Sequence, residues 1–211
     1  MERDLRRFRG RRPEHVIIVG GPGTGKTTLT RALARALGEA GLRTYVIRDW
    51  AREVILEQKA CGGRLLPWVD RVAFEREVVR RHVREYEALY LRGGGAGLHA
   101  VLEDGSPFIA PAYAAADGVE PDEWIVKTLR RWEWVVTLAV VTTPLPRYGT
   151  DNARWECRDY ALRIHEEIRK HIVRRFGGRV MLLRSMTPEG RVAEVLRSPR
   201  IRRLLGGGVR A

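Results

Sequence analysis

The stretch Gly20-Gly21-Pro22-Gly23-Thr24-Gly25-Lys26-Thr27 has the residue types and spacing of a phosphate-binding loop (P-loop), G-x-x-x-x-G-K-[ST]. Its glycines permit backbone conformations that a Cβ would forbid, so successive N–H groups can point inward at phosphate oxygens. We expect Lys26 to bridge the β- and γ-phosphates of a nucleotide and the Thr27 hydroxyl to bind Mg²⁺. The nucleotide-binding residues predicted here are Gly21, Pro22, Gly23, Thr24, Gly25, Lys26, Thr27 and Thr28.

The residues on either side of this loop predict the elements that such a loop requires. A short β-branched run at 15–19 predicts a strand. Residues 27–40 carry Leu and Ala at helical spacing, which predicts an amphipathic helix that Gly41 ends. The N-terminus of that helix would add partial positive charge at the phosphates. A glycine-rich turn that matches the motif by chance would lack this context.

Further along the chain, strand-like and helix-like patterns alternate, as in βαβ units around a parallel sheet. The fold class predicted is therefore α/β, a three-layer P-loop NTPase fold with a five-stranded parallel sheet. We expect one domain at 15–198, a basic N-terminal tail at 1–14 and a basic C-terminal tail at 199–211. The further strands are predicted at about 43–47, 99–103, 134–141 and 179–183, and the further helices after 50 and at about 69–91, 122–131, 155–175 and 188–196.

Composition limits the class of protein. The 211 residues contain no apolar run long enough to span a bilayer and no signal-like segment, so we expect a cytoplasmic protein without membrane contact. Two cysteines outside any C-x-x-C pair and five scattered histidines exclude a disulfide scaffold or a zinc module. The net charge of +13 comes almost entirely from arginine, a thermophile-like bias, which favours a solvated basic surface over a nucleic-acid footprint.

The loop alone does not decide the fate of the γ-phosphate. A GTPase would carry an N-K-x-D guanine motif, and a motor ATPase a hydrophobic run closed by Asp-Glu in a larger chain; neither pattern is present. The sequence therefore favours a kinase. ATP is the expected phosphoryl donor, with GTP as the alternative.

Charged residues follow several of the predicted strands. Asp49 follows the second strand, Glu103 and Asp104 end the third, and Arg147 and Arg154 lie in a loop after the fourth. The carboxyl ends of parallel strands meet at one edge of the sheet, so these residues should face the P-loop. We expect Asp49 or Glu103 to orient the acceptor hydroxyl, Glu103 to join Thr27 at Mg²⁺, Asp104 to lie in the site, and both arginines to stabilise the transferred phosphoryl group.

The order of these segments resembles the NadR-type nicotinamide-riboside kinase group, AAA-domain NTPases related to deoxynucleoside and thymidylate kinases. The segments that carry the resemblance are Asp49-Trp50-Ala51-Arg52, Val101-Leu102-Glu103, Pro144-Leu145-Pro146, Asp151-Asn152-Ala153-Arg154 and Thr187-Pro188-Glu189-Gly190-Arg191. It implies that Asp49, Trp50 and Arg52 contact a nucleoside-like acceptor. It also implies that Arg191 approaches the adenine of ATP.

Two departures from that pattern bear on the acceptor. Asp104 stands where deoxynucleoside and thymidylate kinases usually have Arg, and Asn152 replaces the usual Gly of D-G-x-R. Adjacent carboxylates repel a phosphate unless a cation lies between them, which favours an uncharged hydroxyl acceptor over a nucleoside monophosphate.

Other interpretations stay open. Asp49 could simply cap the following helix, and Trp50 could be a core residue. The basic tails are compatible with a nucleic-acid-binding or regulatory NTPase module, or with a polynucleotide kinase. The leading hypothesis is a small P-loop kinase, monomeric or homodimeric, that uses ATP and Mg²⁺ to phosphorylate a small molecule.

Overall fold

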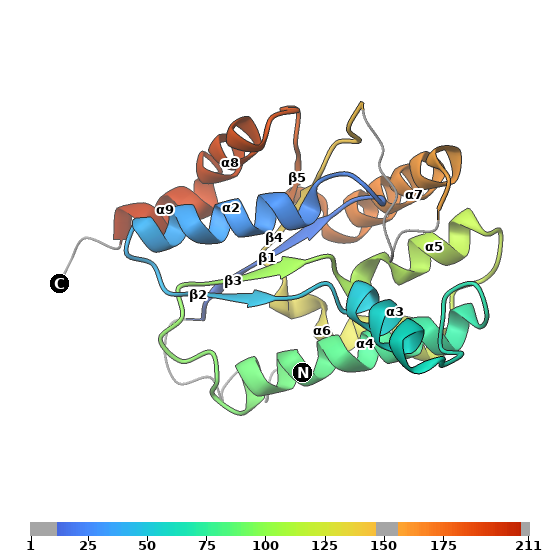
Figure 1. Cartoon of the computed structure of the whole chain (residues 1–211). Coiled ribbons are helices and arrows are strands. Elements are labelled where there is room, and N and C mark those ends of the chain that lie inside the picture. Colours follow the sequence, from blue (N-terminus) through green and yellow to red (C-terminus); the bar gives the residue numbers. More distant parts are fainter. Residues whose placement is uncertain (1–11, 147–155, 208–211) are drawn as a thin grey trace.

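The computed structural model describes residues 12–146 and 156–207, and these form a five-stranded sheet covered by helices (Figure 1). All strand pairs are parallel and the order is β2-β3-β1-β4-β5. The predicted α/β class with a five-stranded parallel sheet is confirmed. The strands are β1 (Glu14–Val19), β2 (Thr44–Ile47), β3 (Ala100–Asp104), β4 (Leu138–Val141) and β5 (Val180–Leu182).

The central strand β1 explains why the sheet must be covered on both faces. It pairs with β3 on one side and β4 on the other, and Val16 to Val19 are all fully buried. Side chains alternate between the two faces of a strand, so an apolar run without polar interruptions requires a packed layer above and below.

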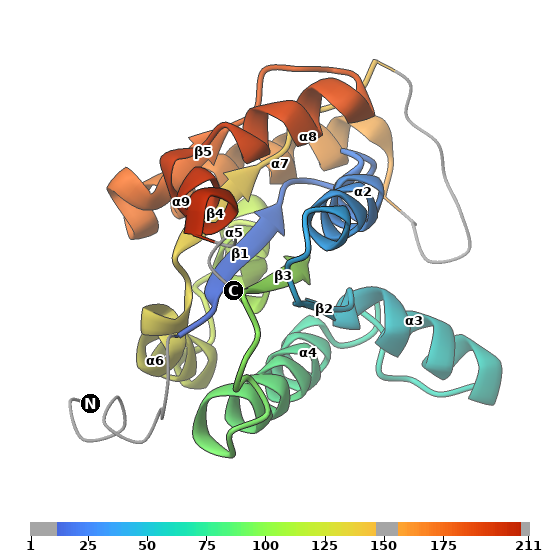
Figure 2. The ribbon, with the colours of Figure 1, turned by 90° about the vertical axis from the view of Figure 1, so that its left-hand side faces the viewer.

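One face is covered by α2 (Lys26–Glu39), α8 (Pro188–Leu196) and α9 (Pro199–Gly207), as Figures 1 and 2 show. Leu29, Leu33 and Leu37 of α2 recur at helical spacing and pack on this face. In α9, Ile201 and Leu204 are buried in the same core. The prediction that a basic tail begins at 199 is therefore wrong for 199–207, because the apolar side of this Arg-rich segment packs on the domain.

The other face carries α4 (Arg71–Tyr86), α5 (Ala110–Ala116), α6 (Glu123–Trp132) and α7 (Arg158–Phe176), whose apolar residues share one core. Short turns extend some of these elements. A π-helical turn, Glu87–Leu91, continues α4, and 3-10 turns lie at Pro107–Ile109, Glu133–Val135 and Gly177–Arg179. The fourth strand is shorter than the predicted 134–141, because the chain leaves α6 through the 3-10 turn before it joins the sheet.

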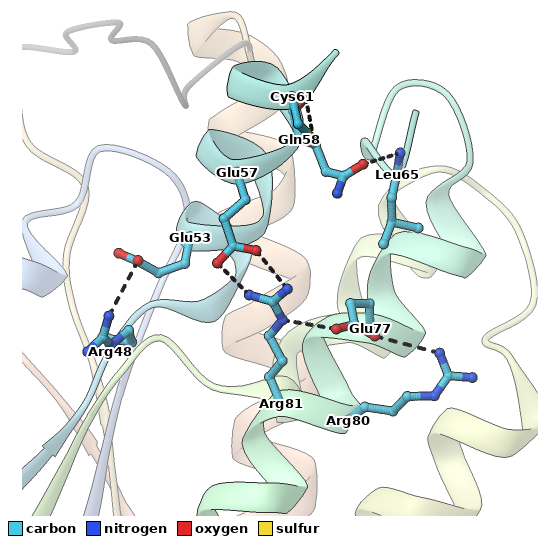
Figure 3. Close-up of polar contacts among 9 residues, drawn as sticks. All are labelled: Arg48, Glu53, Glu57, Gln58, Cys61, Leu65, Glu77, Arg80 and Arg81. Atoms are coloured by element: carbon cyan, nitrogen blue, oxygen red, sulfur yellow. Dashed lines mark hydrogen bonds and ion pairs between the residues drawn. The ribbon is translucent and has the colours of Figure 1, made fainter. Parts of the chain in front are cut away.

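A charged seam joins α4 to α3 (Trp50–Cys61), the helix that follows β2 (Figure 3). Arg81 of α4 donates to both oxygens of Glu57 at 2.7 and 2.8 Å and to Glu77 at 2.9 Å. Its guanidinium also lies over the Trp50 ring. A bidentate Arg–carboxylate pair fixes geometry as well as charge, so this seam holds α3 against α4.

No helix in 12–146 or 156–207 combines the length and apolarity that a membrane crossing would need.

Candidate active site

The P-loop connects β1 to α2, and its conformation depends on glycine. Gly23 has φ 73° and Gly25 has φ 81°, both in the left-handed region that residues with a Cβ avoid. Gly25 is the N-cap of α2, so the first turn of the helix opens onto the loop. Residues 22–28 line one groove together, as the motif predicts. The free N–H groups of a helix N-terminus make such a groove a site for anions.

Two threonines fix the loop to the sheet. Thr142 Oγ1, directly after β4, lies within hydrogen-bonding distance of the Val19 carbonyl oxygen at 3.1 Å and of Thr24 Oγ1 at 2.7 Å. Thr24 in turn donates to the Gly21 carbonyl at 2.9 Å. A Cβ at Gly20 would lie 2.3 Å from Thr142 Oγ1, so this contact requires glycine. Sequence reasoning missed Thr142, although its position at a strand end was a usable signal.

Lys26 reaches back over the loop. Its Nζ donates to the carbonyls of Gly20 and Gly21, both at 3.1 Å. Lys26 lines the groove, so its ammonium group would meet the phosphates of a nucleotide bound there.

His165 of α7 also supports the loop, and sequence reasoning missed this role. Its Nδ1 accepts from the Gly21 N–H at 3.2 Å. Burial lowers the pKa of His165, which favours the neutral ring that this bond requires. A Cβ at Gly21 would come within 2.7 Å of the Ala161 carbonyl. The four-residue spacing of Ala161 and His165 on one helix face was the available signal.

Arg191 has a different role from the predicted adenine contact. It is 3% exposed, and its guanidinium donates to the carbonyls of Thr24, Thr143 and Ser185. These carbonyls belong to the P-loop, the β4 end and the segment before α8. With its donors committed to the backbone, Arg191 is a clamp that positions the loop.

Two adjacent carboxylates at the end of β3 lie on opposite faces of the sheet. Glu103 pairs in register with Ile17 and faces the α4 layer, whereas Asp104 faces the α2 layer. Asp104 is therefore the only carboxylate of this adjacent pair that lies on the P-loop side of the sheet.

Asp104 is the carboxylate beside the P-loop. Burial raises its pKa and the charge of Asp49 raises it further, while contact with Thr27 and the charge of Lys26 oppose that rise. Its Oδ1 is buried without a hydrogen-bond partner among the residues that the structure describes. A carboxylate oxygen in need of a partner, next to a threonine hydroxyl, fits Mg²⁺, which prefers oxygen ligands.

Glu103 does not fit the metal role that the sequence suggested. It is fully buried, accepts from His15 Nε2 at 2.7 Å and from the Tyr86 hydroxyl at 2.8 Å, and lies 2.7 Å from His82 Nδ1. Burial alone would raise its pKa, but the charges and hydrogen bonds of His82 and His15 lower it to about 2. Its oxygens are already satisfied on the far face of the sheet from Thr27.

Asp49 combines the two roles that the sequence left open. Its Oδ1 accepts from the Arg52 N–H at 3.1 Å and so caps α3. Asp49 also lines the P-loop groove together with Lys26 and Arg52. Trp50, in contrast, packs between α3 and α4 beneath Arg48 and Arg81 and lines neither the groove nor the cavity described next. The predicted Trp50 contact with an acceptor ring does not fit this placement.

A second cavity adjoins the P-loop groove. The two spaces share Lys26, Asp49 and Tyr113, among other residues. The walls of the cavity come from α3, α4, the segment after β3, α5 and the residues before α7. They combine apolar with charged side chains, among them Ile55, Phe74, Ile109, Arg71, Glu75 and Glu156.

Arg71 and Glu75 give this cavity a charged wall that sequence reasoning missed. Arg71 Nη1 lies 3.8 Å from Glu75 Oε1, and its guanidinium lies over the Tyr113 ring. Burial raises the pKa of Glu75 to about 7, against the opposing charge of Arg71. Their spacing of four residues in an Arg-rich helix looked like an ordinary surface pair. The predicted phosphoryl-stabilising residues Arg147 and Arg154 lie outside the described residues.

A family model described as an AAA domain matches residues 15–191, which is most of the chain. The chain belongs to this family. The match covers the P-loop, both carboxylates of β3 and Arg191, and it agrees with the AAA-domain resemblance stated from the sequence. The comparison with curated protein sequences gives no match.

Solved structures of NadR proteins share the fold. One, in complex with NAD and AMP-PNP, superposes with a TM-score of 0.54 at 17% identity. Another, in complex with NR, gives 0.57 at 19% identity. Each alignment covers 88% of this chain, but only 49% and 51% of the NadR chains, so this chain spans about half their length.

Proposed function

We propose that this protein is an ATP-dependent kinase that transfers the γ-phosphate to a hydroxyl of a small, nucleoside-like acceptor. The observation that supports the proposal most directly is that the P-loop groove and the adjoining cavity share lining residues. Lys26 and Asp49 line both the P-loop groove and the adjoining cavity. A donor phosphate in the groove and an acceptor in the cavity would meet between an ammonium and a carboxylate, as in-line phosphoryl transfer needs.

Asp49 is the proposed base. Its Oδ1 is held by the Arg52 N–H, which fixes the carboxylate and leaves Oδ2 for the acceptor hydroxyl. As the acceptor oxygen bonds to the γ-phosphorus, the bond to the ADP oxygen breaks and the hydroxyl proton passes to Asp49. Lys26 and the loop N–H groups neutralise charge on the phosphate oxygens.

Thr27 and Asp104 are the residues that would hold Mg²⁺ in this scheme. Asp104 Oδ1 is the buried oxygen that lacks a partner within the described residues, and Thr27 lies beside it. The bound ion would neutralise charge on the β- and γ-phosphates.

The cavity favours an acceptor without a phosphate. Asp49, Glu75 and Glu156 line it, against Lys26 and Arg71. Phe74, Ile109 and Tyr113 provide apolar surface of the kind that packs against a flat ring. A related fold has been solved with NR, which makes nicotinamide riboside the first acceptor to try.

The test is phosphoryl transfer from γ-labelled ATP, and in parallel from GTP, to nicotinamide riboside, common nucleosides, nucleoside monophosphates and oligonucleotide 5′ ends. We expect transfer to at least one nucleoside, slower transfer to its monophosphate, and loss of transfer in Asp49→Asn. Because the amide of Asn still caps α3, the thermal stability of that variant should stay close to wild type. Labelling of oligonucleotides alone would instead establish the polynucleotide-kinase alternative.

A further inference from the structure

The inner end of the acceptor cavity holds two buried polar side chains that the proposed chemistry does not use. His82 of α4 is 2% exposed and Ser106, two residues after β3, is 5% exposed, and both line the cavity. Burying polar groups is costly unless their hydrogen-bonding atoms are satisfied, so the hydrogen-bonding capacity that these two side chains leave unused requires an explanation.

Ser106 is the first of these groups. Its hydroxyl is directed at the Tyr86 oxygen, a contact that lowers the pKa of Tyr86, while the Tyr86 proton is directed to Glu103. Within the described part of the chain, Ser106 Oγ is buried without a hydrogen bond of normal geometry. The lone pairs of this hydroxyl can still accept a hydrogen bond from a bound molecule.

His82 is the second. Its Nδ1 lies 2.7 Å from Glu103 Oε1, which places that edge of the ring against the carboxylate. Nδ1 is buried and faces Glu103, and His82 borders the cavity, so Nε2 is the ring nitrogen left to meet a bound molecule. Glu103 is itself fixed by His15 and Tyr86. The imidazole is therefore held in one orientation by a network that reaches back into the core.

We propose that His82 and Ser106 are specificity-determining residues that hydrogen-bond a polar substituent on the ring of the acceptor, with Glu103 as the positioning residue for His82. This inference rests on the proposed function. The chemical class that fits two such groups on the lining of one cavity is an amide, because it offers a donor and an acceptor side by side. A site built to bond such a group rejects the analogue that lacks it, since its own buried groups are then left unpaired.

The experiment compares two acceptors, nicotinamide riboside and the riboside of unsubstituted pyridine. Both carry the same sugar and the same ring charge, and they differ only in the amide. We expect wild-type kcat/KM to favour the amide by at least about tenfold. In Ser106→Ala that preference should fall to about threefold or less, mainly through KM for nicotinamide riboside.

His82 and Glu103 are tested in the same assay. His82→Leu should lose the preference, and His82→Gln, which keeps a side-chain hydrogen bond, should restore part of it. Glu103→Gln should weaken the preference without abolishing phosphoryl transfer.

The matched control is Ser198→Ala, which removes a buried serine hydroxyl from the other face of the sheet, where Ser198 Oγ accepts from Ile201 N–H. It should leave the preference at the wild-type value. Thermal unfolding with ATP identifies any variant that fails to fold. Phosphorylation of neither riboside by the wild type would overturn the proposed nicotinamide-riboside acceptor, and this inference with it. A preference in folded Ser106→Ala and His82→Leu equal to that of the wild type would overturn this inference alone.

Discussion

The two halves of the candidate site are built from different parts of the polypeptide. The P-loop is shaped by backbone groups, and its supports, Thr142, Arg191 and His165, all bond to the backbone. The acceptor cavity is lined by side chains from several helices and loops. A backbone site binds what all nucleotides share, while a side-chain cavity can change specificity by substitution without loss of the fold.

The P-loop and the cavity also differ in the charged groups that they present. The P-loop offers Lys26 and a helix N-terminus, both attractive to anions. The cavity is bordered by three carboxylates, of which Glu75 is paired with Arg71. Under the proposed function, the groove would hold the phosphates and the carboxylates of the cavity would give a phosphate-free acceptor a fixed direction of approach.

The largest effect should come from Lys26, one of the residues that both halves share. We expect Lys26→Ala to lower kcat/KM by about 100-fold to 1,000-fold or more, because charge on the transferred group loses its only side-chain ammonium partner in the described groove. The measurement is steady-state kinetics with the best acceptor. Far-UV circular dichroism and the thermal midpoint should change little, since Lys26 bonds only two loop carbonyls. Near-normal turnover in Lys26→Ala would contradict the proposed role of Lys26 between the P-loop groove and the cavity.

The next largest effect should distinguish the roles of Asp104 and Glu103, the two carboxylates of β3. We expect Asp104→Asn to lower turnover and to raise the Mg²⁺ concentration for half-maximal rate by roughly tenfold or more, because the amide is a weaker metal ligand than a carboxylate. Glu103→Gln is the matched control, since it removes the neighbouring charge on the opposite face of the sheet. Its Mg²⁺ requirement should equal that of the wild type. An equal rise in the Mg²⁺ requirement of both variants would mean that Asp104 and Glu103 do not differ in metal binding, although they lie on opposite faces of the sheet.

These two residues also show what the sequence could and could not predict. The P-loop and the parallel sheet follow from local patterns, a glycine-rich loop between an apolar strand and an amphipathic helix, and both are confirmed. The pairing of Asp104 rather than Glu103 with Thr27 depends on which face of β3 each residue occupies. That requires the strand register, which a run of buried residues does not reveal.

Long-range contacts account for the rest of what the sequence missed. Arg191, His165 and His82 are far from their partners along the chain and join them only through the fold. In a chain so rich in arginine, Arg191 could not be distinguished from a surface residue by type alone. Likewise, the burial of α9 depends on the core that it meets, which composition does not specify.

A smaller effect should follow from loss of the Arg191 clamp. Arg191→Leu leaves the carbonyls of Thr24, Thr143 and Ser185 without their buried donors, which costs about 2–4 kcal/mol of stability. We expect the thermal midpoint to fall by on the order of 10 °C. Nucleotide affinity should fall as well, because the loop loses its support. The thermal midpoint of Arg191→Lys should lie between those of the wild type and Arg191→Leu. An unchanged midpoint in Arg191→Leu would show that water replaces the lost guanidinium donors.

The smallest effect concerns the charged wall of the acceptor cavity and depends on pH. Burial raises the pKa of Glu75 from 4.5 to about 7, so between these values the unfolded chain releases a proton that the folded protein keeps. The contribution of Glu75 to the free energy of unfolding is therefore fully present below about pH 4.5 and is lost as pH rises through 7. On the order of 2–3 kcal/mol should disappear over this range.

Glu75→Gln removes that titration while keeping the size of the side chain, so stability relative to wild type should improve steadily from pH 5 to pH 8. Chemical denaturation of both proteins across this range provides the measurement. Every other group titrates alike in the two chains, and the difference between them therefore isolates residue 75. A difference in the free energy of unfolding that stays constant with pH would mean that Glu75 is ionised throughout this range. The charge of Arg71 would then outweigh the effect of burial on the pKa of Glu75.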